Sequence, residues 1–177
     1  MKLRNTLLLL FICSVVFDSF AQSNYQTFQS KGFKVKCDCK LQVNSAFIQM
    51  VKQQGLKNVL GSYICAQNEG NSNTGVIVNI NIYDESENYK NIQQSNYATF
   101  DKKYMDQYIG GLTYSGIKYK IITYQGVQAI EYTFNQMGLP TTAIVFLKNK
   151  KSYLLQVSTR SDLTTKFNAL KSSFTLL

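Results

Sequence analysis

The sequence contains no histidine. This absence excludes zinc sites built on histidine, serine–histidine and cysteine–histidine nucleophile pairs, and acid–base catalysis by imidazole. An enzyme of this composition would need a carboxylate, tyrosine, lysine or thiol mechanism, and the sequence has no cluster of catalytic residue types. We therefore favour a protein that is not an enzyme, with no catalytic residues, cofactor or metal, and keep a thiol or carboxylate enzyme as the alternative.

Beyond its N-terminus, the sequence has no long apolar run. Residues 1–21 have the layout of a secretory signal peptide: Lys2 and Arg4 precede an apolar run at 7–17, and small residues occupy the −3 and −1 positions of a cleavage site after Ala21. The run is shorter than the roughly 20 residues of a membrane span, so an uncleaved anchor is the weaker alternative. The mature protein is expected to be periplasmic or secreted, with no transmembrane anchor.

The sequence also lacks internal repeats and low-complexity segments. Residues 22–31 are polar without a clear period, which predicts a flexible leader, and residues 32–177 have the length of a single domain. The formal net charge of the whole sequence is +9, which favours anionic surroundings. We expect an unidentified protein or an anionic envelope component as partner rather than nucleic acid. A basic surface with no dedicated partner is the alternative, because the lysines are dispersed.

The clearest structural pattern lies in the C-terminal third. Runs of strand-forming residues are separated by turn signals at Gln125-Gly126, at Gly138 and at 149–151, which predicts strands at 117–124, 127–134, 141–149 and 152–159. The next apolar residues recur at helical spacing and predict an amphipathic helix with Ser161 as its cap: Leu163, Phe167, Leu170 and Phe174.

The first half is more varied. Alternating apolar residues predict strands at 33–43 and 76–83, with a shorter strand at 62–67 and a loop at 68–75. A short helix is expected to end near Gly55. A longer helix from about Asn96 to Gly110 carries an aromatic stripe that is expected to face the core: Tyr97, Phe100, Tyr104 and Tyr108. Together the elements predict an α+β domain, a largely antiparallel sheet packed by two or three helices.

Several packing motifs in this order resemble the PsbP-like group. The chain has a glycine–aromatic opening at Gly32-Phe33, a hairpin around Gly126, a strand bearing Tyr153, and a terminal helix that finishes on Ser173-Phe174. The resemblance covers most of residues 32–177. It implies a sheet sandwiched by helices and a non-enzymatic binding or assembly role, similar to exported bacterial members of the group. It carries over no functional residue.

Three cysteines, Cys37, Cys39 and Cys65, remain after removal of the signal peptide. On an extended strand Cys37 and Cys39 point to the same face, so they compete for Cys65. We favour a Cys39–Cys65 disulfide, because it ties the opening strand to 62–67, with Cys37–Cys65 as the alternative. A reactive or metal-binding Cys37/Cys39 pair would instead suit a thiol or redox enzyme of the cell envelope.

Two carboxylate features are candidate sites. The run Asp84 to Glu87 lacks the spacing of a calcium loop and is expected to be a solvated acidic turn. Glu131 stands alone, and a carboxylate-dependent enzyme would need a second carboxylate within about 10 Å of it.

Lysines near the predicted hairpins form the best candidate for an anion-binding surface. These lysines are Lys118, Lys120, Lys148, Lys150 and Lys151. They are expected to gather at one end and face of the sheet, interleaved with Tyr114, Tyr119 and Tyr124. The alternative is that these lysines bind no partner, because lysines at hairpin tips and sheet edges commonly serve to keep exposed strand edges soluble.

Overall fold

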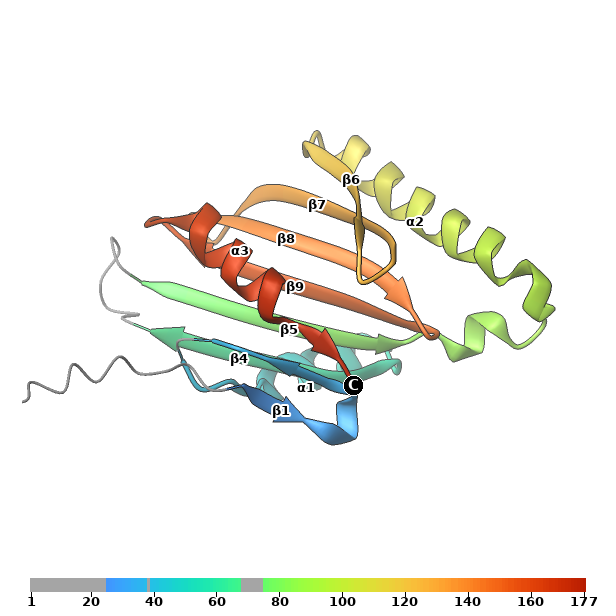
Figure 1. Ribbon diagram of the computed structural model, residues 1–177, viewed down its shortest axis with the longest axis horizontal. Helices are drawn as coiled ribbons and strands as arrows, with labels where there is room; N and C mark the ends of the chain where they lie inside the picture. Colours follow the sequence, from blue (N-terminus) through green and yellow to red (C-terminus); the bar gives the residue numbers. More distant parts are fainter. Residues whose placement is uncertain (1–24, 38, 68–74) are drawn as a thin grey trace, which may run out of the picture.

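The computed structural model describes residues 25–37, 39–67 and 75–177. The expected signal peptide and most of the expected loop 68–75 lie outside the described residues. The main sheet has seven antiparallel strands in the order β3-β4-β5-β9-β8-β7-β6 (Figure 1). Their bounds are β3 Gln42–Val43, β4 Val59–Gln67, β5 Val76–Asp84, β6 Tyr119–Tyr124, β7 Val127–Gln136, β8 Leu139–Lys148 and β9 Lys151–Thr159. The predicted fold class, an antiparallel sheet packed by helices, is confirmed.

A second, smaller sheet joins the two ends of the described chain. It consists of β1 (Gln26–Phe28), β2 (Phe33–Val35) and β10 (Thr175–Leu176), with β2 in the middle. The 3-10 helix η1 (Gln29–Lys31) connects β1 to β2. Residues 26–31, part of the segment expected to be a flexible leader, therefore belong to the fold.

The predicted strand at 33–43 is wrong as a continuous element. β2 ends at Val35 and β3 begins only at Gln42, because the two halves pair with different partners. β2 pairs with β1 and β10, whereas β3 pairs with β4. The alternation in the sequence therefore belongs to two short strands in two different sheets.

Three tight hairpins build the β6–β9 part of the main sheet. The two turn residues of each hairpin have positive φ: Gln125 and Gly126, Met137 and Gly138, and Asn149 and Lys150. Two-residue loops of this kind match the twist of the flanking strands. Lys150 adopts this backbone with φ of 58° although it is not glycine.

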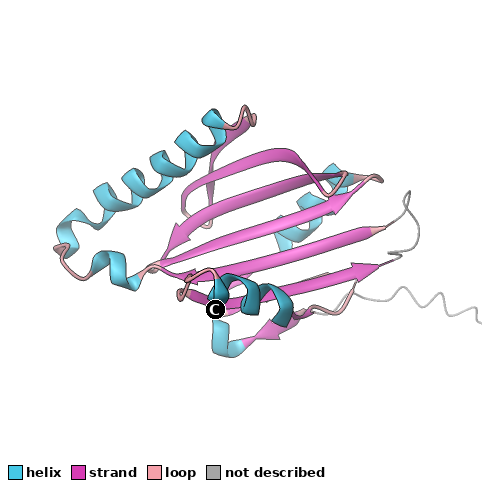
Figure 2. Cartoon of the chain, turned by 180° about the vertical axis from the view of Figure 1, so that it is seen from behind, coloured by secondary structure: helices cyan, strands magenta, loops and turns pink. Residues whose placement is uncertain are grey.

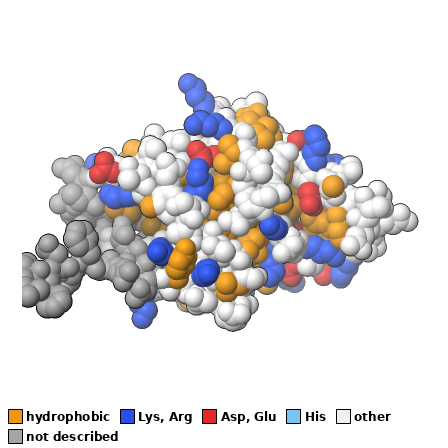
Figure 3. All heavy atoms as spheres, in the orientation of Figure 1, with side chains coloured by type: hydrophobic (Ala, Val, Ile, Leu, Met, Phe, Trp, Pro, Cys, Tyr) orange, Lys and Arg blue, Asp and Glu red, His pale blue; other side chains and the backbone are white. Residues whose placement is uncertain are grey.

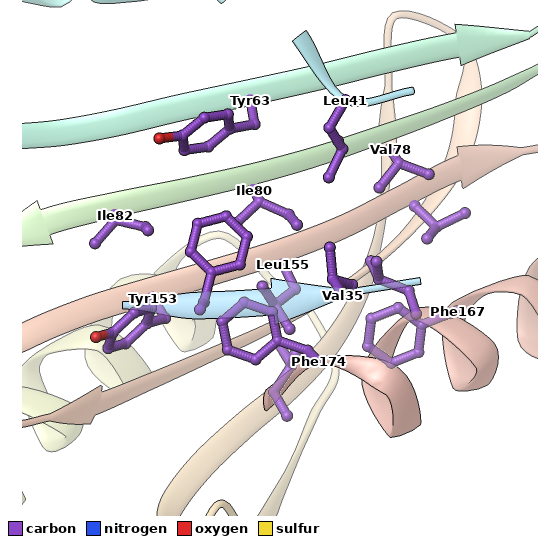
Figure 4. Close-up of a cluster of buried hydrophobic side chains, with 14 of the residues drawn as sticks. Val35, Leu41, Tyr63, Val78, Ile80, Ile82, Tyr153, Leu155, Phe167 and Phe174 are labelled. Carbon is purple, nitrogen blue, oxygen red and sulfur yellow. The ribbon is translucent and has the colours of Figure 1, made fainter. Parts of the chain in front are cut away.

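One face of the main sheet is covered by α3 (Leu163–Ser173) and by the small sheet. Figure 4 shows Phe167 and Phe174 lying among Ile80 and Leu155. Phe174 is 1% exposed, and its ring stacks on that of Phe33 at 5.3 Å. The predicted terminal helix is present, but its N-cap is Asp162 rather than Ser161, and Asp162 makes no side-chain capping bond.

The opposite face carries α1 (Ser45–Gln53) and α2 (Tyr97–Tyr114), as seen from behind in Figure 2. α1 begins at Asn44, whose Oδ1 accepts a hydrogen bond from the Phe47 amide at 3.1 Å. α2 packs its buried residues on β7 and β8. α2 continues past the expected stop at Gly110 and ends at Tyr114. Gly110 and Gly111 are exposed and keep helical backbone geometry, and the chain turns only at Gly116, whose φ is 66°.

Candidate ligand-binding site

The sheet face between α1 and α2 is polar. In β5, Val78, Ile80 and Ile82 point into the α3-side core, so the alternate residues Asn79, Asn81 and Tyr83 point to the helix α2 side. Their paired positions are mixed: Ser62 on β4 and Ser152 and Gln156 on β9 are polar, whereas Val59, Ile64 and Leu154 are apolar. Two polar pairs bond across strands: Ser62 Oγ donates to Asn81 Oδ1 at 2.6 Å, and the hydroxyls of Thr141 on β8 and Ser158 on β9 lie 2.8 Å apart. This strip is flanked by both helices.

A cavity of about 300 Å³ opens at one end of this strip. We call it the tyrosine cavity. Its walls come from the segment after α1, the end of β5, helix α2, and strands β8 and β9: Leu56, Asn58, Tyr83, Glu85, Tyr104, Tyr108, Val145, Ser152 and Leu154. Sequence reasoning did not find it, because its lining is drawn from segments nearly 100 residues apart. The only local signal was the spacing of Tyr104 and Tyr108.

Glu85 is the residue around which this cavity is organised. Its side chain is buried, with the residue 4% exposed. Oε1 accepts hydrogen bonds from the Tyr104 hydroxyl at 3.0 Å and the Ser152 hydroxyl at 2.9 Å, and Oε2 accepts one from Asn88 Nδ2 at 2.7 Å. The Glu85 amide donates to the Lys150 carbonyl at 2.8 Å, which fixes the backbone against the β8–β9 turn.

The expectation of a solvated acidic turn at 84–87 is therefore wrong for Glu85. It holds for Glu87, which is exposed and forms an ion pair with Lys90 at 2.6 Å. Asp84 accepts a hydrogen bond from the Ser86 amide, and hydrogen bonding by Ser86 lowers the pKa of the Asp84 carboxyl. One residue of the run turns inward because donors from α2 and β9 meet it there.

The tyrosines of the cavity remain protonated at neutral pH. Burial raises the pKa of Tyr104 to about 12, and it also raises the pKa of Tyr83 and Tyr108. The Tyr108 hydroxyl lies 2.7 Å from that of Tyr132, so a second hydrogen-bonded pair lies under α2. Among the described residues that line the cavity, Glu85 is the only aspartate or glutamate, and none is lysine or arginine.

The N-terminal half of the aromatic stripe on α2 has a different environment. The Tyr89 ring meets those of Tyr97 and Phe100 edge-on, at 5.0 and 4.6 Å. The Lys150 ammonium lies over this cluster, 4.7 Å from the Tyr97 ring centroid and 5.6 Å from that of Tyr89. The stripe packs against the core, as predicted, but Tyr104 and Tyr108 also line the cavity.

Glu131 lies on the other face of the sheet. Its Oε2 forms an ion pair with Lys171 of α3 at 2.6 Å, with both side chains about one-fifth exposed. Glu131 and Glu85 are thus on opposite faces, and the described structure does not bring them together in one site.

The five lysines of the expected anion-binding surface do not gather. Lys118 and Lys120 lie at the start of β6, where they line a groove of about 330 Å³ with Glu131. The other three lie at the β8–β9 turn, at the opposite end of the strands: Lys148, Lys150 and Lys151. Lys148 donates to the Gln125 carbonyl, and Lys150 is held over tyrosine rings. Figure 3 shows lysine and arginine side chains scattered over one face of the molecule. Antiparallel register separates the two groups, which sequence proximity could not show.

The cysteines lie near the far end of the small sheet. Cys39 and Cys65 form a disulfide with their Cα atoms 5.9 Å apart, the pair favoured from the sequence. Cys37 and Cys39 line a cavity of about 150 Å³ together with Lys36 and Lys166. Glu131 is not part of its lining, so the thiol and carboxylate features occupy separate places.

No protein-family model matches this chain, and no curated protein is significantly similar to it. Among the helices described, none is long and apolar enough to cross a membrane. In the described part of the chain, no group of three or more histidine, cysteine, aspartate or glutamate residues is arranged to hold a metal ion.

Proposed function

We propose that this chain is an exported, non-catalytic ligand-binding domain of PsbP-like type, which acts as a binding or assembly accessory in the periplasm or outside the cell. The tyrosine cavity is the ligand site of the proposed domain. The observation that carries this proposal is the cavity itself: about 300 Å³ of space beside a buried, hydrogen-bonded carboxylate, within the size range of small-molecule sites.

The state of the carboxylates favours binding over catalysis. Both oxygens of Glu85 accept hydrogen bonds from neutral side chains, and Glu131 is ion-paired on the opposite face. Two carboxylates that act together on one bond must face the same reacting group. A thiol mechanism would have to use Cys37 and Cys39, which line another cavity and of which Cys39 is in a disulfide.

Export is supported by the disulfide and by the N-terminal sequence. Disulfides persist in oxidising compartments and are rare in the cytosol. The arrangement of α3 also suits the proposed family type, since its end at Ser173-Phe174 places a buried aromatic ring over the sheet.

The proposal is tested by a ligand-observed NMR screen with a chemically diverse set of small molecules. The protein is compared with Leu154→Phe, which adds a ring to the cavity wall, and with Leu139→Phe, the same change at the far end of β8. We expect ligands that bind the unmodified protein and Leu139→Phe but not Leu154→Phe. A screen without ligands, or ligands that bind Leu154→Phe equally well, would contradict the proposal.

A further inference from the structure

The buried Glu85 side chain has no cationic partner within ion-pair distance in the described structure. None of the ion pairs between described residues includes it. Its three side-chain partners are an amide and two hydroxyls, all neutral donors. Charged side chains away from water are normally paired with an opposite charge. The cavity is where such a charge would be supplied.

The lining favours an organic cation over a metal ion. A divalent metal needs several anionic or carbonyl oxygens, and Glu85 is a single carboxylate in a described region without a cluster of metal-ligating side chains. Apart from Asn58 and Ser152, the other walls are carbon-rich: three tyrosines, together with Leu56, Val145 and Leu154. Aromatic and aliphatic walls stabilise a cation that itself carries alkyl groups.

The same helix face already holds one ammonium group. Lys150 Nζ lies 4.7 Å from the ring centroid of Tyr97, about two turns before Tyr104 on α2. Tyr104 and Tyr108 continue this stripe into the cavity, but there the lining contains no lysine or arginine. The cavity thus combines aromatic walls with a carboxylate and lacks the cation that the neighbouring aromatic cluster has.

We propose that the tyrosine cavity binds a small organic ammonium ion, with Glu85 as its counter-charge and Tyr83, Tyr104 and Tyr108 as its aromatic walls. Glu85 Oε2 accepts one hydrogen bond whereas Oε1 accepts two, so Oε2 keeps a lone pair for an N–H donor or for direct ionic contact. The cavity volume of about 300 Å³ restricts the ligand to a small ammonium compound. This inference rests on the proposed binding function.

The experiment compares cations with neutral molecules of the same shape. Choline and butylammonium are titrated into the full mature chain alongside their neutral counterparts, 3,3-dimethylbutanol and butanol, and binding is followed by NMR shifts of the tyrosine side chains. The chain has no tryptophan and 12 tyrosines, so tyrosine fluorescence gives a second readout. We expect at least one ammonium probe to bind about tenfold more tightly than its neutral counterpart.

Glu85→Gln should abolish this preference. Glutamine keeps the size of the side chain and an oxygen that accepts from Tyr104 and Ser152. The matched control is Glu131→Gln, which removes a carboxylate on the other face and should leave the preference for cations unchanged. If Glu85→Gln does not fold, the preference measured in the unmodified chain and its loss in Leu154→Phe decide the question.

Each outcome separates this inference from the proposed function. Equal affinity for cations and neutral molecules, or an unchanged preference in Glu85→Gln, overturns the ammonium assignment and leaves a binding cavity. If no ammonium probe binds while the diverse screen yields other ligands, the assignment is likewise overturned. If the diverse screen also yields none, the proposed function fails together with it.

Discussion

The Cys39–Cys65 disulfide closes a loop with a sequence separation of 26, which contains β3 and α1. In the chain-entropy model, closing a loop of this length stabilises the folded state by about 3.5 kcal/mol, because the crosslink restricts the unfolded chain. For a domain of this size, losing that amount should lower the melting temperature by roughly 10 °C.

The perturbation must prevent Cys37 from taking over the bridge. We therefore take Cys37→Ser as the reference protein, in which the Cys39–Cys65 pair is intact, and compare it with the double variant Cys37→Ser, Cys39→Ser. The remaining Cys65 thiol stays in the core, where it behaves as a small apolar group. The difference between the two proteins then reports the crosslink rather than a change in packing.

The assay is urea unfolding followed by circular dichroism, with thiol counting and peptide mapping of the oxidised proteins. We expect a free-energy loss of about 3.5 kcal/mol in the double variant, and the same loss when the reference protein is reduced. A loss below about 1 kcal/mol would refute the reasoning, since it would mean that the crosslink hardly restricts the unfolded chain. Mapping that finds Cys37 joined to Cys65 in the unmodified protein would refute the pairing.

Three further outcomes are expected. Phe174→Ala should cost about 3–5 kcal/mol in urea unfolding, because a fully buried ring leaves a cavity between α3 and the sheet, whereas the exposed Met137→Ala should cost almost nothing. Stability should fall as the pH rises from about 10 to about 12, because burial raises the folded pKa values of Tyr104 and Tyr124 to about 12, above the ordinary tyrosine pKa of about 10. Between these values the unfolded chain loses protons that the folded chain keeps, so the fold loses stability. Unfolding curves and tyrosinate absorbance measured against pH test this, and pH-independent stability would contradict it. If the lysines bind anions, binding of the protein to anionic vesicles should weaken as salt is added. Binding should also fall when charge is removed from either of the two lysine groups, Lys118 with Lys120, or Lys148 with Lys150 and Lys151. Binding that does not depend on salt would count against the anion-binding prediction.

Local pattern accounts for what could be predicted. The alternation in β5 assigned Val78, Ile80 and Ile82 to one face, and the turn residues around Gly126 and Gly138 placed two hairpins. These features depend on residues that are adjacent in sequence, so periodicity and backbone preference are sufficient to find them. The same holds for the stripe on α2, whose aromatic residues share one side of a helix.

The candidate site depends on contacts that no local pattern contains. Glu85 is buried because Ser152, 67 residues further along the chain, and Tyr104 on α2 donate to it. The split of 33–43 into β2 and β3 likewise requires the C-terminal strand β10, which pairs with β2. The sequence by itself determined the fold class and most strands and helices after residue 44, but not the two short strands that replace 33–43 or the small sheet. Only the tertiary structure decided which polar residues meet in a cavity, because burial and hydrogen bonding are set by strand register and helix docking between distant segments.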